Sequence, residues 1–302
     1  MSIIQLPRIL GLEAVSELLG QWPNGPASVE IVLHNNQWVE PAGLTALACL
    51  IEKTRQMGGE VCVRHDECAT VGYWERMGFF REMRLVGPPP AGAPRAADGR
   101  FAELRRISDI NDVDSITDEL VSVVQPSVEE RRMIGHILSE AMNNVCQHSM
   151  AEGFSAAQYW PSSGQMKFCI ADYGCGLRQA LSARYQPSTD GAAIDLALKV
   201  GVTSNPPQFG QPQMRNRGVG LSCIHRLVTA NHGSFDLWSE TARYDGVVGG
   251  VANSNIPWTG TLIAVTMERN CLTDNFRQIM HDLAAELRQV EKQKSSRAPR
   301  RE

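Results

Sequence analysis

Three polar side chains recur at every fourth position of one segment, HILSEAMNNVCQHS, which begins at His136. They are Glu140, Asn144 and His148. An α-helix advances about 100° per residue, so side chains four apart lie along one stripe. A carboxylate can act as a general base, and an amide oxygen suits a magnesium ion held mainly by phosphates and water. The spacing therefore permits catalytic chemistry, although such a stripe is also common on a solvated helix face.

Three further motifs follow along the chain, each of them weak when taken alone. Glycines that follow an aspartate usually mark a turn. A glycine pair before a helix is a weak indication of phosphate binding at free N–H groups, and Gly-Thr before a strand carries almost no information. In this order, flanked by strand and helix patterns, the motifs favour one shared ligand site. They are Asp172-x-Gly174-x-Gly176, Gly218-x-Gly220-Leu221 and Gly260-Thr261.

The elements that must position these residues are visible as local patterns. An apolar run predicts a strand over 166–171, directly before Asp172, and a second strand follows Thr261. Ser127 with Glu130 three residues later is a capping box at the start of the first helix. Apolar residues have core-facing spacing in this helix and in a later one: Ile134, Ile137, Leu138, Ala141 and Val145 in the first, Leu221, Ile224, Leu227 and Val228 in the second.

A segment rich in proline, glycine and alanine, residues 86–100, predicts a linker or an exposed loop. Before it, strand patterns at 28–34 and 60–64 alternate with helix patterns at 43–59 and 69–80, which indicates a small α/β layer with some parallel pairing. We therefore expect an α/β protein of two domains, 1–85 and 105–270, joined by a linker at 86–104. Residues 271–302 are expected to form a C-terminal helix and a disordered basic tail.

Composition and charge limit the class of protein. The net charge of −4 and the pI of about 6.0 argue against nucleic acid as a main partner. The sequence contains no run of about 18 apolar residues, so no membrane span is predicted. The eight cysteines form no C-x-x-C pair, and no secretion signal is visible, so we expect reduced thiols in a cytoplasmic protein without a Cys or His metal centre.

The first unit resembles a STAS domain, the fold of anti-sigma-factor antagonists, over roughly residues 1–85. The resemblance rests on NNQWVEPAGLTALACLIEKTRQMGGEVCV. Phosphoregulated STAS domains carry an acidic residue, two serines and a glycine where this chain has Glu40, Pro41, Ala42 and Gly43. Proline and alanine have no hydroxyl to accept a phosphate. The resemblance therefore implies a STAS-like fold that is not switched by phosphorylation at this loop.

The four motifs of the second unit resemble the GHKL ATPase superfamily, which includes gyrase B, the heat-shock chaperone ATPase, histidine-kinase catalytic domains and anti-sigma-factor kinases. The resemblance covers roughly residues 105–270. It is strongest to the anti-sigma-factor kinases, whose N box has the form E-x-x-x-N-x-x-x-H, matched here by Glu140, Asn144 and His148. It implies a Bergerat-type α/β sandwich in which helices cover one face of a mixed sheet.

The resemblance also implies roles around ATP and Mg²⁺. Glu140 would be the general base, Asn144 the magnesium ligand, and Asp172 the acceptor for the adenine amino group. His148 would contact phosphate or hydrogen-bond within the fold, and these alternatives stay open. The implied nucleotide contacts also include Gly174, Gly176, Gly218, Gly220, Leu221 and Thr261. Residues 177–217 would be the ATP lid, where Arg215 and Arg217 are either phosphate contacts or solvated loop charges.

Three functions are compatible with these motifs. The first is a serine/threonine kinase of the anti-sigma type that acts on a separate STAS-domain protein, within a pathway that could include a sigma factor. The second is a conformational switch driven by ATP hydrolysis, and the third is a nucleotide-dependent interaction module without turnover. The Glu140–Asn144 pair argues against the interaction module, because a site without turnover has no chemical need for both residues. Members of this group often dimerise, so a homodimer is compatible with the sequence.

Overall fold

The computed structural model describes residues 1–89, 100–204 and 218–297, and it is a mixed α/β structure with several sheets. The N-terminal part, residues 1–89, contains a parallel sheet in the order β1-β3-β5 and a smaller parallel pair, β2-β4. The parallel pairing expected for this part is confirmed. Its elements are β1 (Ser2–Gln5), β2 (Ile9–Leu10), α1 (Val15–Gln21), β3 (Val29–Val32), β4 (Trp38–Val39), α2 (Pro41–Gln56), β5 (Val61–Arg64), α3 (Val71–Arg76) and α4 (Phe79–Glu82).

The C-terminal part, residues 100–297, is built on a five-stranded sheet in the order β6-β7-β8-β10-β9. Its strands are β6 (Phe101–Ile107), β7 (Gly153–Trp160), β8 (Gln165–Asp172), β9 (Ser234–Asp245) and β10 (Gly250–Glu268). Its helices are α5 (Ile110–Ser122), α6 (Val128–His148), α7 (Leu177–Tyr185), α8 (Asp190–Ala197), α9 (Gly220–Ala230), the 3-10 turn η1 (Arg269–Cys271) and α10 (Phe276–Arg297).

The large sheet differs from the mixed sheet that was expected. All four pairings between its described strands are antiparallel. Adjacent strands in the chain, such as β7 and β8, are joined by a tight turn that includes Gly164 with a positive φ of 71°. A short connection of this kind can only reverse the chain, whereas a parallel neighbour needs a long crossover.

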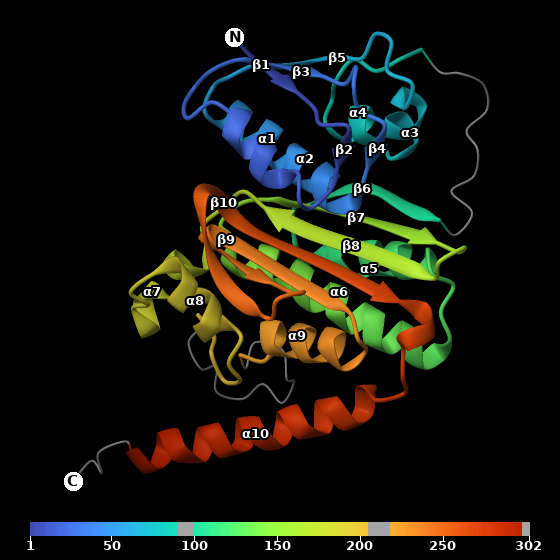
Figure 1. Cartoon of the computed structure of the whole chain (residues 1–302). Coiled ribbons are helices and arrows are strands. Elements are labelled where there is room, and N and C mark those ends of the chain that lie inside the picture. Colours follow the sequence, from blue (N-terminus) through green and yellow to red (C-terminus); the bar gives the residue numbers. More distant parts are fainter. Residues whose placement is uncertain (90–99, 205–217, 298–302) are drawn as a thin grey trace.

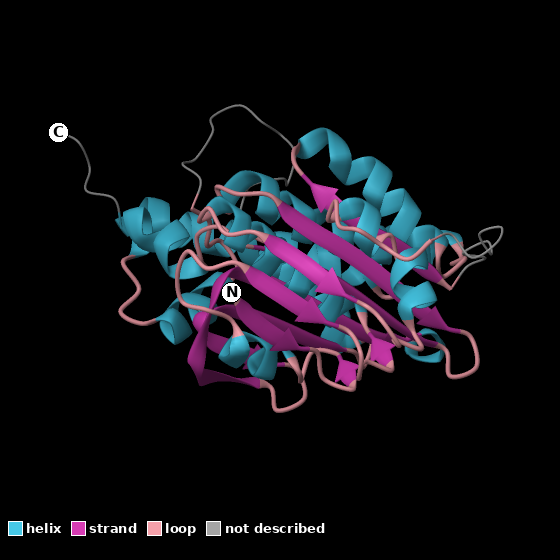
Figure 2. Cartoon of the chain, turned by 90° about the horizontal axis from the view of Figure 1, so that it is seen from above, coloured by secondary structure: helices cyan, strands magenta, loops and turns pink. Residues whose placement is uncertain are grey.

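Both faces of the large sheet are covered, but the helices of the C-terminal part that pack on it lie on one face, and the N-terminal part covers the other. Helices α5, α6 and α9 lie on one face, and α1 and α2 of the N-terminal part lie on the other (Figure 1). In the view from above, the N-terminus projects onto the middle of the molecule (Figure 2), so the N-terminal part lies over the sheet rather than beside it. Buried residues of α2 and of β7, β8 and β10 belong to one apolar cluster: among them are Leu44, Leu47, Phe154, Cys169 and Leu262.

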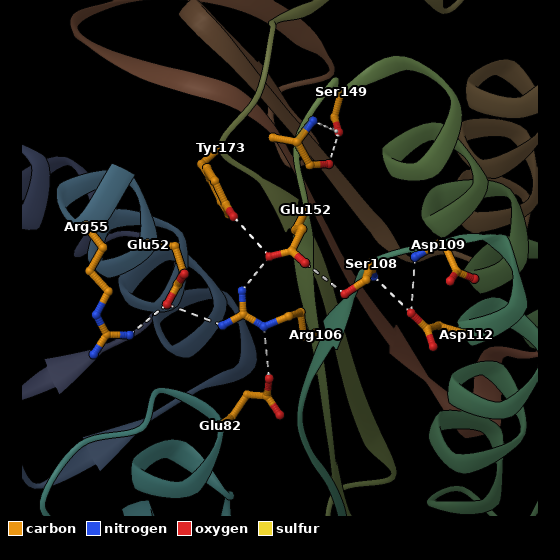
Figure 3. Close-up of polar contacts among 11 residues, drawn as sticks. Glu52, Arg55, Glu82, Arg106, Ser108, Asp109, Asp112, Ser149, Glu152 and Tyr173 are labelled. Carbon is orange, nitrogen blue, oxygen red and sulfur yellow. Dashed lines mark hydrogen bonds and ion pairs between the residues drawn. The ribbon is translucent and has the colours of Figure 1, made fainter. Parts of the chain in front are cut away.

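Polar contacts also join the two parts. Arg106 on β6 forms ion pairs with Glu52 of α2 at 3.3 Å, Glu82 of α4 at 3.3 Å and Glu152 at 2.6 Å. Figure 3 shows these carboxylates around the guanidinium, with the Tyr173 hydroxyl donating to Glu152 at 3.3 Å. Burial alone would lower the pKa of Arg106, but the carboxylates outweigh this effect and raise the pKa. The N-terminal part is therefore attached by a half-buried charge network as well as by a shared core.

Local signals account for several of these elements. The capping box at Ser127 is present, with the Ser127 Oγ accepting from Glu130 N at 3.3 Å and the Glu130 carboxylate accepting from Ser127 N at 2.6 Å. The single helix expected over 69–80 is split into α3 and α4 by Gly78, whose φ is 71°. Strand β6 begins inside the segment expected as a linker. The expected C-terminal helix is present as α10, which continues to Arg297. Residues 298–302 of the expected tail lie outside the described residues.

None of the described helices is both long and apolar enough to span a membrane.

Candidate functional site

Most of the predicted site residues line one open cavity between α6, the end of β8, β10 and the start of α9. Gly174 does not line it, although it lies in the adjoining loop. Arg215 and Arg217 fall outside the residues that the structure describes. The predicted residues that the fold brings together are Glu140, Asn144, His148, Asp172, Gly176, Gly218, Gly220, Leu221 and Thr261.

Asp172 is the buried carboxylate of this cavity, and the residue is 3% exposed. Its Oδ1 accepts a hydrogen bond from the Gly174 N–H at 2.9 Å. Burial raises the pKa of the carboxyl to about 7, although the backbone N–H groups of Gly174 and Thr261 partly offset this effect. A carboxyl held near its pKa at neutral pH is well suited to accept a hydrogen bond from a ligand amino group, because such a donor stabilises the ionised form.

Glu140 and Asn144 meet the start of α9 at Gly220. A Cβ built on Gly220 would lie 2.9 Å from Glu140 Oε2 and within 4 Å of both amide atoms of Asn144. The Asn144 Nδ2 is buried and has no hydrogen-bond partner among the described residues. A buried donor without a partner costs free energy unless a water or a ligand satisfies it. The absence of a side chain at Gly220 therefore leaves space at a helix N-terminus beside a polar group that needs a partner.

His148 ends the polar stripe and makes a contact within the fold. Its Nδ1 lies 2.9 Å from Ser204 Oγ. Burial lowers the pKa of the imidazole, which favours the neutral ring. Of the two roles left open for His148, the hydrogen bond within the fold is present, and a phosphate contact stays a prediction.

Glycines 174 and 176 are required by close packing on the turn after β8. A Cβ on Gly174 would lie 1.9 Å from the carbonyl oxygen of Ser149, at the end of α6. A Cβ on Gly176 would lie 2.6 Å from Glu240 Cγ and 2.8 Å from Ser239 Oγ. These contacts hold the turn between α6 and β9, so that Asp172 keeps its position at the edge of the cavity.

Gly218 has a different role in the approach to α9. Its φ of 78° lies in the left-handed region, and a Cβ there would lie 2.5 Å from the carbonyl oxygen of Val202. The Gly201 N–H donates to the Gly218 carbonyl at 2.8 Å. This backbone pairing sets the direction in which α9 begins, with Gly220 as its first residue.

Several residues of the cavity were not predicted. Ile170 and Ile263 are cross-strand partners on β8 and β10 and both line it. Each lies two residues from a predicted member, Asp172 or Thr261, so the period-two rule of a strand would have placed them on the same face. Leu177 and Leu181 of α7 and Ala197 of α8 complete an apolar wall. The sequence contains no comparable signal for this wall because both helices are short.

Glu240 is a further residue without a sequence signal. Backbone N–H groups of Gly176 and Gly260 interact with its carboxylate, and its charge acts on Asp172. Burial raises the pKa of Glu240. Its φ of 50° is unusual for a residue with a side chain. A strained backbone held beside the buried Asp172 indicates a position determined by the surrounding turn rather than by strand geometry.

The donor set fits a magnesium–polyphosphate better than an isolated metal ion. Within the described part of the chain, no group of three or more His, Cys, Asp or Glu residues could hold a metal. Mg²⁺ commonly takes few protein ligands and keeps phosphate and water oxygens, which the Asn144 amide oxygen beside Glu140 could complement. Space at Gly220 and the unpartnered Asn144 amide fit a phosphate-bearing ligand, and the apolar walls with Asp172 fit a planar base.

Comparison with known proteins adds no assignment: no protein-family model matches the chain, and no curated protein matches it.

Proposed function

We propose that this chain binds Mg-ATP in the cavity between α6, β8, β10 and α9. The observation that carries the proposal is the convergence of Asp172, Glu140 and Asn144 on one cavity, although Asp172 lies far from the other two in the sequence. Asp172 would accept from the adenine amino group between the apolar side chains of Ile170 and Ile263. Asn144 would ligate Mg²⁺, and the N–H groups at the start of α9 would bind phosphate.

The reaction that we propose is phosphoryl transfer to a serine or threonine of a separate STAS-domain protein. Mg-ATP would supply the γ-phosphoryl group, and ADP would be the leaving group. Glu140 would take the proton from the attacking hydroxyl, and Asn144 would orient the phosphate end of the ligand. The attached N-terminal part is a poor acceptor, because Pro41 and Ala42 have no hydroxyl and Thr45 is buried on the opposite face of the sheet, where it donates to Pro41 O at 2.9 Å.

A second candidate function is an ATP-driven switch, which one observation specifically favours. The N-terminal part shares its core with the sheet that carries Asp172, and Glu240 interacts electrostatically with both Asp172 and Lys53 of α2. A change in the charge near Asp172 would therefore affect the contact between α2 of the N-terminal part and the large sheet. In this case hydrolysis by Glu140-activated water would replace transfer to a protein.

One experiment separates these candidates. The purified chain is incubated with Mg²⁺, γ-labelled ATP and candidate STAS-domain proteins that contain the phosphorylatable serine. Label on the partner supports the kinase, whereas free phosphate without labelled partner supports the switch. Glu140→Gln, which keeps the size of the side chain and removes the base, is the matched control.

ATP binding itself is tested separately by thermal shift with ATP, ADP and GTP. A ligand at 100 times its dissociation constant raises the free energy of unfolding by about 2.7 kcal/mol. ATP and ADP should raise the melting temperature, and GTP should not, because guanine has a carbonyl where adenine has the amino donor for Asp172. An equal effect of GTP, or no effect of ATP, would contradict the nucleotide assignment.

A further inference from the structure

A second cavity lies on the other face of the large sheet. It is partly open and is lined by α1, the loop after α1, α2 and the segment Pro257–Thr259 of β10. Tyr173, the residue after Asp172, forms part of its wall. The cavity is therefore distinct from the nucleotide cavity and lies between the N-terminal part and the sheet.

The walls of this second cavity are mainly apolar and aromatic. Two tryptophans, Trp22 and Trp258, belong to them, and both are buried. The other apolar side chains include Leu19, Leu50, Met57 and Pro257. Rigid aromatic and aliphatic walls of this kind are typical of sites for small organic ligands, which bury most of their surface.

One polar group of the wall has no partner in the described part of the protein. Trp258 is 1% exposed, and its indole N–H makes no hydrogen bond with any described residue. The indole N–H of Trp22, by contrast, donates to Thr54 Oγ1 at 2.9 Å. Buried tryptophan N–H groups normally have an acceptor. The indole N–H of Trp258 is therefore an unsatisfied donor on a residue that lines this cavity.

The charge of the cavity comes from one residue. Lys53 of α2 is the only Lys, Arg, His, Asp or Glu among the lining residues that the structure describes. Its ammonium interacts electrostatically with the carboxylate of Glu240. A half-buried lysine and an unpartnered indole N–H, on two residues that line the same cavity, could supply two donor groups and a positive charge for an anionic acceptor.

We propose that this cavity binds a small organic carboxylate with a flat apolar body. The body would lie between Trp22 and Trp258, and the carboxylate would accept from the Trp258 N–H and from the Lys53 ammonium. A neutral molecule of the same shape would use the apolar walls and lose the charge-assisted hydrogen bond. This inference does not depend on nucleotide binding, because none of the residues that carry it lines the nucleotide cavity.

The test compares 1-naphthylacetate with the neutral 1-naphthylacetamide by isothermal titration of the full chain without nucleotide. The acid should bind at least about tenfold more tightly than the amide, which is the scale of one charge-assisted hydrogen bond. Lys53→Met should remove this preference and leave binding of the amide unchanged, which also shows that the cavity is intact. Trp258→Phe should weaken binding of the acid.

Lys292→Met is the matched control, because Lys292 is an exposed lysine on α10, away from both cavities, and should leave both affinities unchanged. Equal binding of acid and amide to the wild-type chain would overturn the proposal. So would an unchanged preference for the acid in Lys53→Met, or the absence of binding of both probes at about 1 mM, where even a weak specific site is half filled.

Discussion

Asp172 and Tyr173 are consecutive in the chain and face opposite sides of the large sheet. Asp172 lines the cavity between α6 and α9, whereas Tyr173 lines the cavity beneath the N-terminal part and donates to Glu152. This alternation follows from the pleat of a strand, in which neighbouring side chains point to opposite faces. The end of β8 therefore connects the proposed nucleotide site directly with the elements that hold the N-terminal part.

Replacement of Asp172 by Asn should abolish ATP binding. The substitution keeps the size of the side chain but removes the charge and introduces an NH₂ group, which would face the adenine amino donor. We expect the stabilising thermal shift of ATP to disappear and the dissociation constant to rise at least about tenfold, the effect of one lost charge-assisted hydrogen bond. Unchanged ATP affinity in this variant, measured by titration calorimetry, would contradict the assignment.

Glu140→Gln should separate binding from turnover. The amide has the same shape as the carboxylate but cannot accept a proton from a hydroxyl or water, so ATP affinity should stay within a few-fold of wild type. General-base catalysis typically contributes about 10²- to 10⁴-fold to the rate, and phosphate release or transfer should fall on that scale. With γ-labelled ATP, both free phosphate and phosphorylated partner protein can be measured. Full turnover in this variant would show that Glu140 is not the base.

The pH dependence of ATP binding follows from the pKa of Asp172, which burial raises to about 7 in the free protein. Protonation removes the acceptor for the amino group, so affinity should be nearly constant above about pH 8. It should fall by about tenfold for each pH unit below about 7, because the ionised fraction falls tenfold. Calorimetric titrations between about pH 6 and pH 8.5 measure this. A flat profile would show that the charge of Asp172 plays no part.

The same pKa has a consequence for stability. An aspartate whose folded pKa lies above its ordinary value of 3.8 binds its proton more tightly in the folded state. Its burial therefore destabilises the fold above about pH 7, and this penalty declines as the pH falls towards about 4. Asp172→Asn should accordingly raise the melting temperature of the free protein at pH 8 and raise it less at pH 6. A larger gain at pH 6 would contradict the raised pKa.

Gly174→Ala should destabilise the chain because the new methyl group has no room. Its Cβ would lie 1.9 Å from Ser149 O, and overpacking of this kind costs typically about 1–3 kcal/mol. Gly72→Ala is the matched control, because Gly72 lies in α3 with no atom within 4 Å of the position that the methyl group would take. Alanine favours a helix over glycine by about 0.5–1 kcal/mol. In urea unfolding, the midpoint concentration should fall for Gly174→Ala and rise for Gly72→Ala.

Arg106→Met should weaken the attachment of the N-terminal part. It leaves Glu52, Glu82 and Glu152 without their shared cation in a half-buried network, so it should cost more than the roughly 1 kcal/mol at most that an exposed ion pair contributes. Arg81→Met, which removes an exposed pair with Glu103, should cost less than about 1 kcal/mol. Limited proteolysis and urea unfolding should report earlier opening in Arg106→Met alone. Equal effects of the two variants would show that the network does not hold the parts together.

Part of the candidate site was predictable because it depends on local spacing. The four-residue interval of Glu140, Asn144 and His148 places them on one side of a helix whatever the rest of the chain does. Asp172 at the end of an apolar strand was visible for the same reason. Ser204, Leu181 and Glu240 were not, because their contacts with the site arise from turns and short helices whose directions depend on distant packing.

Local signals were sufficient to predict the start and the amphipathic pattern of α6, the strand before Asp172 and the alternating elements of the N-terminal part, since capping and side-chain periodicity are local free energies. Long-range packing decided that β10 lies between β8 and β9 in the large sheet and that α2 covers the second face of that sheet. It also decided that Tyr173 and Trp258 enclose a second cavity there. Those outcomes depend on which apolar surfaces meet over long sequence separations, and no local pattern encodes that choice.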